Sequence, residues 1–311
     1  MTFRRARLQN FGPLSELSLE TAEIPSPAPG EVLIRVEAAA VNPVDWKLSL
    51  GYLRGAVPIP LPYTPGCDVA GKIVAMGEGV KGFTIGDSVF GYPSLMRGGA
   101  FAEYALLQED EFAAAPAGLA LSEAAAYPVA AVTAYEGLFE AGQLQSGQRL
   151  LVLGGAGAVG SLAAQMGMLH GAEVYATTSP RNLELVSSLG VKTVDYTLPL
   201  TDQVRDVDFV LDAVGGEARA QALATIKRGG RMITPVWPGP DAQELGTLGI
   251  EGSFYGIVPN RAHLEKIRPW IETGKLRMNI EREYALEEIV PALEHSATGR
   301  TRGKLLISMQ S

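Results

Sequence analysis

A glycine-rich turn is the segment of this sequence whose residue types and spacing most clearly suit a chemical task. Gly154, Gly157 and Gly160 follow the apolar run Leu150–Leu153 and open a helical pattern. Glycine permits positive φ angles and a close approach to a pyrophosphate, and the N–H groups at the helix start then bind its phosphates. We therefore predict a dinucleotide site, with a tight turn without ligand as the alternative. Its expected contacts are Gly154, Ala156, Gly157, Ala158, Val159 and Gly160.

The end of the next predicted strand, Glu173–Thr177, bears on which dinucleotide binds. An NAD site carries a carboxylate about 20 residues beyond the glycines, but Ala176–Asn182 contains no acidic residue. Hydroxyl groups and one guanidinium suit the 2′-phosphate of NADPH instead, and a hydrogen bond to a charged group contributes roughly 1.5–3 kcal/mol. A solvated arginine at a helix start is the alternative for Arg181. The candidates at this end of the cofactor are Thr178, Ser179, Arg181 and Tyr196.

Other catalytic arrangements are missing from the sequence. The single cysteine, Cys67, excludes an internal disulfide and a multi-thiolate metal site, and the three histidines are isolated. No G-x-S-x-G motif occurs, and Gly299–Lys304 has three residues between its glycines where a phosphate-binding loop has four. We therefore expect no bound metal, and we expect hydride transfer from a nicotinamide to be the chemistry.

Two different sequence patterns along the chain predict the strands and helices that position these residues. Short strands separated by Gly and Pro fill the first third and predict a β-barrel-like domain. Strands and helices then alternate, which predicts βαβ units and a parallel sheet. The predicted strands are Glu31–Ala38, Val69–Met76, two short ones within Phe83–Phe90, Ala100–Leu107, Leu150–Leu153, Glu173–Thr177, Phe209–Ala213, Arg231–Pro235 and Lys304–Met309. The predicted helices are Ser122–Leu138 with Ser122 as N-cap, Gly160–His170, Asn182–Leu189, Ala218–Ile226, Arg261–Thr273 and Leu286–Ser296, kinked or starting late at Pro291.

The bulk properties exclude several partner classes. The chain has 311 residues, a hydrophobic fraction of 47% and a net charge of −8. This acidic balance argues against nucleic acids and anionic membrane surfaces. The uncharged run Leu150–Leu169 is long enough to span a bilayer, but a buried strand, turn and helix explain it better. One cysteine and no apolar run after the first arginines lead us to expect a cytoplasmic location.

A series of motifs in a fixed order resembles the medium-chain dehydrogenase/reductase superfamily. The likeness is to its zinc-free NADPH:quinone oxidoreductases, the zeta-crystallin-like proteins, and it covers nearly the whole chain. Each motif is moderately specific, and the ordered set is highly specific. The motifs are residues 29–36 (PGEVLIRV), 41–47 (VNPVDWK), 65–71 (PGCDVAG), 86–91 (GDSVFG), 98–104 (GGAFAEY), 132–135 (VTAY), the glycine turn and 303–305 (GKL).

The resemblance implies an α/β fold in which a Rossmann doubly wound parallel sheet is inserted into a GroES-like β-barrel domain. We place the GroES-like part at residues 1–120, the NADP-binding Rossmann domain at 121–256 and the return to the first domain at 257–311. By motif, Asn42, Cys67 and Val129 occupy the positions of the catalytic zinc ligands in zinc-dependent relatives. Cys67 and Asp68 alone do not make a zinc site.

The resemblance also implies roles for individual residues. Asn42 is expected to help position the nicotinamide, and Val129, Ala130 and Thr133 are expected to line the same region. An arginine near the C-terminus sometimes joins the 2′-phosphate site in this family, which makes Arg300 and Arg302 candidates, with Arg302 our choice. Phe254 and Tyr255 lie on a strand where family dimers pair, so we expect a homodimer.

The substrate end of the site is less defined. Trp46 follows Asp45 in the second motif and either borders a flat substrate pocket or packs between the two domains. Lys47 is either a proton donor or a solvated charge. With Asn42, the candidate catalytic residues are Asp45, Lys47, Tyr52 and Tyr63. Since water can protonate a reduced quinone, a dedicated acid is optional.

Three functions remain open at this point. The first is an NADPH-dependent reductase of quinones or related conjugated carbonyls, with a small-molecule quinone or enone as substrate. The second is an enone or enoyl (2-alkenal) reductase, which uses the same cofactor but reduces a β-carbon. The third is a non-catalytic NADPH-binding sensor, which would bind the cofactor tightly without turnover.

Overall fold

The computed structural model describes residues 1–309, and the chain divides into two compact units. The first contains Met1–Val129, Val258–Glu272 and the chain from Asn279, so it is built from both ends of the sequence. The second contains Ala130–Ile257 and Thr273–Met278. The sequence predicts domain boundaries at residues 120 and 256, and the structure divides the chain after residues 129 and 257.

The first unit is built around β-sheets. A seven-stranded sheet has the order β14-β15-β3-β4-β5-β7, with β6 paired to β3, and a separate hairpin pairs β1 with β2. Neighbouring strands of the larger sheet pair antiparallel, except that β14 pairs parallel with β15. The strands are β1 (Thr2–Leu8), β2 (Leu17–Glu23), β3 (Glu31–Ala40), β4 (Asp68–Met76), β5 (Ser88–Gly91), β6 (Tyr104–Gln108), β7 (Phe112–Ala114), β14 (Ile280–Ala285) and β15 (Lys304–Ser308).

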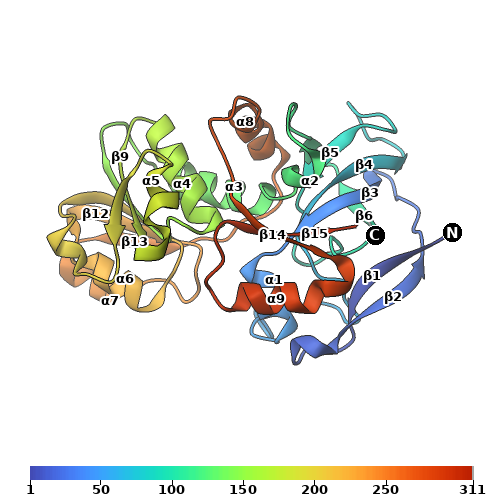
Figure 1. The fold of residues 1–311 in the computed structure, drawn as a ribbon, viewed down its shortest axis with the longest axis horizontal. Coiled ribbons are helices and arrows are strands. Elements are labelled where there is room, and N and C mark those ends of the chain that lie inside the picture. The colour runs from blue at the N-terminus through green and yellow to red at the C-terminus, as the bar shows by residue number, and fades with distance from the viewer. Residues whose placement is uncertain (310–311) are drawn as a thin grey trace. The chain divides into compact units, whose positions relative to one another are not determined.

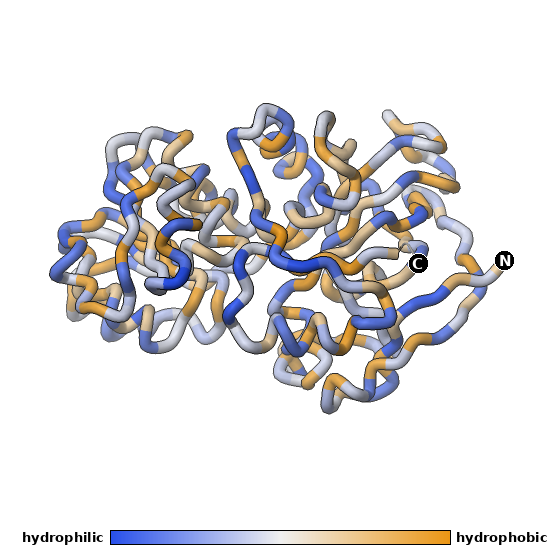
Figure 2. Tube along the Cα trace, viewed as in Figure 1, coloured by the Kyte–Doolittle hydropathy of each residue, from blue (hydrophilic) through white to orange (hydrophobic). Residues whose placement is uncertain are grey.

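Helices and short turns of helix complete the first unit (Figure 1). Its core consists of the inward-facing side chains of the sheet together with Leu286, Ile289 and Leu293 near α9. The helical elements are η1 (Leu14–Glu16), α1 (Pro43–Ser49), α2 (Leu121–Ala124), α8 (Arg261–Glu272), η5 (Leu286–Glu288) and α9 (Ile289–Ala297). β14 is hydrophilic along most of its length (Figure 2), as expected for a strand at the edge of this sheet.

The second unit is a parallel six-stranded sheet of order β10-β9-β8-β11-β12-β13. The strand order reverses direction between β8 and β11, and since crossovers between parallel strands are right-handed, α4 and α6 are expected on opposite faces of the sheet. The strands are β8 (Arg149–Leu153), β9 (Glu173–Thr178), β10 (Lys192–Asp195), β11 (Val207–Asp212), β12 (Ile226–Thr234) and β13 (Glu251–Phe254). The helices are α3 (Pro128–Tyr135), which enters from the first unit, the π-helical η2 (Glu136–Ala141), α4 (Ala158–Leu169), η3 (Pro180–Asn182), α5 (Leu183–Ser187), η4 (Leu200–Asp202), α6 (Gly216–Leu223) and α7 (Ala242–Leu248).

The predicted fold class is confirmed, and so are most of the predicted strands. The helical stretch from 286 starts late, as expected, because Pro291 lies in the first turn of α9, where no N–H is needed. Along the part of the chain that the structure describes, no helix is both long enough and apolar enough to cross a bilayer. The uncharged run Leu150–Leu169 forms β8, the glycine turn and α4.

Three predictions of local structure are wrong. The helix expected over Ser122–Leu138 is interrupted before Pro128, which cannot donate a backbone hydrogen bond, and Ala120 rather than Ser122 caps its first piece. Only the second of the two short strands within Phe83–Phe90 forms, since Asp87 accepts hydrogen bonds from Thr84 and closes a turn. The strand expected from Ala100 starts at Tyr104.

Candidate active site

The glycine motif forms the turn between β8 and α4, in the middle of the parallel sheet. Gly154 has a φ angle of +81°, which favours glycine, and Gly157 is the N-cap of α4. A Cβ atom on Gly160 would overlap with the carbonyl oxygen of Gly154, so the helix can start this close to the strand only with glycine there. A Cβ atom on Gly157 would lie 3.4 Å from the same carbonyl oxygen, which is ordinary van der Waals contact. The turn therefore fits the pyrophosphate of a dinucleotide.

The same turn is fixed to the neighbouring strand β9. The backbone N–H of Gly154 donates to Thr177 Oγ1 at 3.0 Å, and that of Gly155 donates to the Thr177 carbonyl at 2.9 Å. A Cβ on Gly155 would lie 2.8 Å from the Cβ of Ala176, which requires glycine there as well. The pyrophosphate turn and the end of β9 are therefore held in one rigid arrangement.

The end of β9 presents polar groups and no carboxylate. Thr178 is buried, and its Oγ1 has no hydrogen-bond partner among the described residues, and neither does Asn182 Oδ1. Buried polar atoms are normally paired, so both are expected to be satisfied by a bound molecule or water. The backbone N–H of Tyr196 donates to the Thr178 carbonyl at 3.1 Å, which brings the half-exposed Tyr196 beside this strand end. Ser179 and Arg181 continue the chain into η3.

The end of β9 combines a hydroxyl group and a guanidinium group with no carboxylate. A hydroxyl donor at Thr178 and a guanidinium at Arg181 complement a phosphate, whereas the ribose diol of NAD normally pairs with a carboxylate. Asn182 was not among the sequence-based candidates, because only its burial and its unpaired oxygen distinguish it from an ordinary helix-start residue.

The predicted nicotinamide-end residues are divided between the two units. Val129 belongs to the first unit, and Ala130 and Thr133 belong to the second. Within the second unit the Thr133 carbonyl accepts a hydrogen bond from the Tyr255 hydroxyl at 2.7 Å, and burial raises the pKa of that phenol. Tyr255 therefore holds α3 in place and remains protonated. Tyr255 is not free to act as a proton donor.

A buried polar network surrounds Asn42 in the first unit. Asp68 Oδ2 accepts hydrogen bonds from Lys304 Nζ at 2.6 Å and from Asn42 Nδ2 at 2.8 Å, and its Oδ1 accepts the backbone N–H of Val129 at 2.7 Å. Lys304 also donates to Asn42 Oδ1 at 2.6 Å and to the Val41 carbonyl at 3.3 Å. Asp68 is 0% exposed and Lys304 2%. The network thus gathers Asn42 and Val129 around one carboxylate and fixes the orientation of the Asn42 amide.

The network depends on the return of the chain end to the first domain. β15 pairs with β3, and the N–H of Val41 donates to the Leu305 carbonyl at 3.0 Å, which carries Lys304 to the end of β3. Lys304 was part of a family motif in the sequence but not a predicted site residue. Its burial is a consequence of strand pairing over more than 200 residues of chain, which no local pattern reveals.

Asp45 lies next to this network but has a different role. Its Oδ2 accepts the backbone N–H of Asn42 at 2.7 Å and so caps the start of α1. Burial raises the pKa of Asp45 to about 7, and the Asp68 charge adds to that shift, while the Asn42 N–H and Lys304 oppose it. Burial likewise raises the pKa of the Cys67 thiol, so Cys67 is not poised to act as a thiolate.

The remaining catalytic candidates do not converge on Asn42. The Tyr63 hydroxyl donates to the Leu95 carbonyl at 2.8 Å, and burial raises its pKa. Tyr52 is 69% exposed and packs edge-on against Trp46, and the Lys47 ammonium lies 5.5 Å from the centre of the Trp46 ring. The structure therefore brings Asn42 and Asp45 together, with Tyr63 near enough that the Cys67 and Asp45 charges add to its raised pKa, whereas Lys47 and Tyr52 lie against Trp46.

Arg300 and Arg302 lie in the turn that leads from α9 into β15, within the first unit. The N–H of Arg302 donates to Glu281 Oε2 at 2.7 Å, and the Arg302 carbonyl accepts from Asn279 Nδ2 at 2.7 Å. These bonds fix the backbone of the turn, and the choice of Arg302 remains a prediction. No group of three or more His, Cys, Asp or Glu side chains within residues 1–309 is arranged to hold a metal ion.

Comparisons with known proteins agree with this geometry. Residues 28–117 match the model of the alcohol dehydrogenase GroES-like domain, and residues 189–307 match that of the zinc-binding dehydrogenases. A 2-methylene-furan-3-one reductase of Solanum lycopersicum is 38% identical, with 96% of this chain and 77% of that protein covered. A chloroplastic NADPH-dependent alkenal/one oxidoreductase of Arabidopsis thaliana is 34% identical over the same shares. The solved quinone oxidoreductase of Coxiella burnetii is 28% identical, with a TM-score of 0.90 and both chains fully covered.

Proposed function

Because the chain belongs to the quinone oxidoreductase family of the medium-chain dehydrogenase/reductase superfamily, we propose that it reduces quinones or related conjugated carbonyls with NADPH. The observation that carries the choice of NADPH is the strand end of β9, where a buried unpaired hydroxyl and an arginine stand in place of a carboxylate. When bound, this cofactor supplies a hydride from its nicotinamide ring.

The residues of the chain bind and orient the reactants. The turn Gly154–Gly160 holds the pyrophosphate through backbone N–H groups, and Thr178, Ser179, Arg181 and Tyr196 bind the 2′-phosphate end. Asn42 contributes to the nicotinamide site, with its amide held by Asp68 and Lys304. A fixed amide costs no reorganisation when the reactants bind.

We assign the proton to water rather than to a side chain. The Tyr63 hydroxyl donates a hydrogen bond to the Leu95 carbonyl, and the side chains of Tyr52 and Lys47 contact Trp46. Two-electron reduction of a quinone by hydride leaves a hydroquinone anion, which water protonates.

Reduction of an enone is the second candidate, supported by the names of the two plant relatives. In that reaction the hydride adds to the β-carbon and a proton adds to the α-carbon. The two outcomes are separated with NADPH deuterated at C4, because only enone reduction leaves deuterium on a carbon of the product.

The direct test of the proposal is stopped-flow oxidation of NADPH with 1,4-benzoquinone, 9,10-phenanthrenequinone and an enal. We expect turnover with at least one acceptor class. Tight binding of NADPH without turnover on any acceptor would favour the sensor and remove the proposal.

We also propose a homodimer and a cytoplasmic location. β13 is the edge of the parallel sheet and all four of its residues are exposed, and Phe254 stacks edge-on with Trp237, which is 73% exposed. An exposed edge strand with apolar neighbours supports pairing with a second copy. Light scattering of Phe254→Lys against the unsubstituted chain tests the dimer, and a monomer in both would refute it.

The single, buried cysteine supports the cytoplasmic location, which cell fractionation tests.

A further inference from the structure

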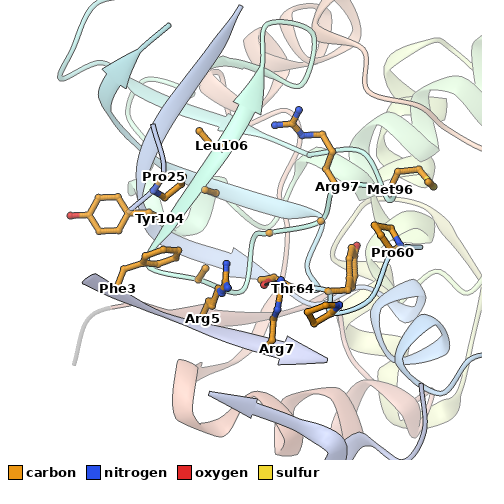
Figure 3. Close-up of a pocket in the computed structure, with 16 residues that line it drawn as sticks. Phe3, Arg5, Arg7, Pro25, Pro60, Thr64, Met96, Arg97, Tyr104 and Leu106 are labelled. Carbon is orange, nitrogen blue, oxygen red and sulfur yellow. Dashed lines mark hydrogen bonds between the residues drawn. The ribbon is translucent and has the colours of Figure 1, made fainter. Parts of the chain in front are cut away.

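A cavity of about 250 Å³ lies in the first unit, and strand β1 forms one of its walls (Figure 3). Phe3, Arg5 and Arg7 project from the same face of β1, since side chains two residues apart on a strand share a face. Tyr104 and Leu106 of β6 and the segments 60–64 and 96–99 complete the wall. None of the residues placed in the cofactor turn or in the Asn42 network lines this cavity.

The lining carries three guanidinium groups and no carboxylate. Arg97 lies across the cavity from β1 and is paired with Glu31 at 2.8 Å. Arg5 and Arg7, in contrast, share one carboxylate, because Glu20 accepts Arg5 Nη2 at 2.6 Å and lies 3.5 Å from Arg7 Nε. Arg97 also lies 3.8 Å from the buried Glu111 carboxylate, so the surplus of positive charge is confined to the β1 side of the cavity, where two guanidinium groups share one carboxylate.

Arg7 carries this surplus. Its side chain is 18% exposed and its Nη1 donates to Thr64 Oγ1 at 3.3 Å, while its buried Nε faces Glu20 at 3.5 Å but makes no hydrogen bond within residues 1–309. Burial and the nearby Arg5 charge lower the pKa of Arg7, and the Glu20 charge opposes that shift without cancelling it. An unsatisfied buried N–H of a charged group is costly, and a carboxylate pairs with a guanidinium through two parallel hydrogen bonds.

The other walls of the cavity are apolar. Phe3 and Tyr104 pack edge-on at 5.8 Å, and three prolines, Leu106 and Met96 add hydrocarbon surface. A pocket of this size is smaller than the 300–1,000 Å³ typical of drug-sized ligands. The lining therefore suits a small molecule with one anionic group and an apolar body.

We propose that this cavity is a second binding site, specific for a small aromatic monocarboxylate whose carboxylate pairs with Arg7 and Arg5 and whose ring lies against Phe3 and Tyr104. The site is independent of the reductase activity, because it is built from other residues. Benzoate is the probe, benzamide is its uncharged counterpart, and inorganic phosphate is an anion without the apolar body.

The test measures benzoate binding by calorimetry to the full chain and to two variants. Arg7→Met is expected to weaken benzoate binding at least tenfold, and it leaves Glu20 paired with Arg5, so the fold is expected to survive. Arg4→Met is the matched control, since Arg4 lies on the same strand, pairs with Glu103 and does not line the cavity. We expect it to change the affinity less than twofold.

The ligands give a second, variant-free readout. Benzamide and inorganic phosphate are each expected to bind at least tenfold more weakly than benzoate. Equal losses in Arg7→Met and Arg4→Met, or equal binding of phosphate and benzoate, would show a general attraction of anions and overturn the proposal. Absence of benzoate binding to the unsubstituted chain would also overturn it. If Arg7→Met does not fold, Arg7→Lys replaces it, and unaltered benzoate binding there would contradict paired hydrogen bonding.

Discussion

The glycine turn of the second unit and the Asn42 network of the first are built on opposite principles. The turn does its work with backbone alone, within seven consecutive residues that lack long side chains. The network needs side chains from β3's end, β4 and β15, brought together by strand pairing. A site of the first kind fails when a side chain is added, whereas one of the second kind fails when a side chain is removed.

The largest effect is expected in the network. Lys304→Met leaves the Asp68 carboxylate buried without its ammonium partner, and breaking such a pair costs about 3–5 kcal/mol of unfolding free energy. Urea unfolding measures this cost. Asp68→Asn in the same chain removes the orphaned charge, so the double variant is expected to be more stable than Lys304→Met alone. Additive losses from the two substitutions would contradict the pairing.

Adding a side chain to the turn is the complementary test. Gly160→Val forces a Cβ into the Gly154 carbonyl, so the start of α4 must move away from β8. We expect NADPH affinity to fall by about a hundredfold or more, as fluorescence titration measures, since loss of the phosphate-binding N–H groups removes roughly 3 kcal/mol. Gly246→Ala is the control, because this helical glycine in α7 has open space around its Cβ position. Equal NADPH affinity in Gly160→Val and the control would show that the turn does not bind the cofactor.

A pH titration sharpens the comparison on the network side. The folded-state pKa of Asp45 is about 7, above its unfolded value near 3.9, so the native state binds the extra proton between these two values. The stability contributed by this proton is complete below about pH 4 and is lost as the pH rises through 7, with a limiting slope of about 1.4 kcal/mol per pH unit. Asp45→Asn is expected to remove that decline. An unchanged pH profile in Asp45→Asn would assign the decline to another group.

The contrast also explains what the sequence predicts well. The glycine turn, β8, α4 and the strand end at β9 are local patterns, and their placement follows from one βαβ unit. Tyr63 and Lys304 are not predictable in this way. The Tyr63 hydroxyl is used by a carbonyl of a distant loop, and Lys304 is buried only because β15 pairs with β3. The interrupted helix shows the same limit on a smaller scale. The Ala-rich composition of 122–138 predicted one continuous helix, but Pro128, which lacks an N–H, divides it into α2 and α3.

The central claim is that the end of β9 selects a phosphorylated dinucleotide, and equilibrium titration of NADPH and NADH measures it. In the unsubstituted chain we expect NADPH to bind at least tenfold more tightly than NADH. In Arg181→Ala we expect this ratio to fall by about ten- to a hundredfold, through loss of NADPH affinity alone, since one charge-assisted hydrogen bond contributes roughly 1.5–3 kcal/mol. Equal affinities for the two dinucleotides in the unsubstituted chain would contradict the account.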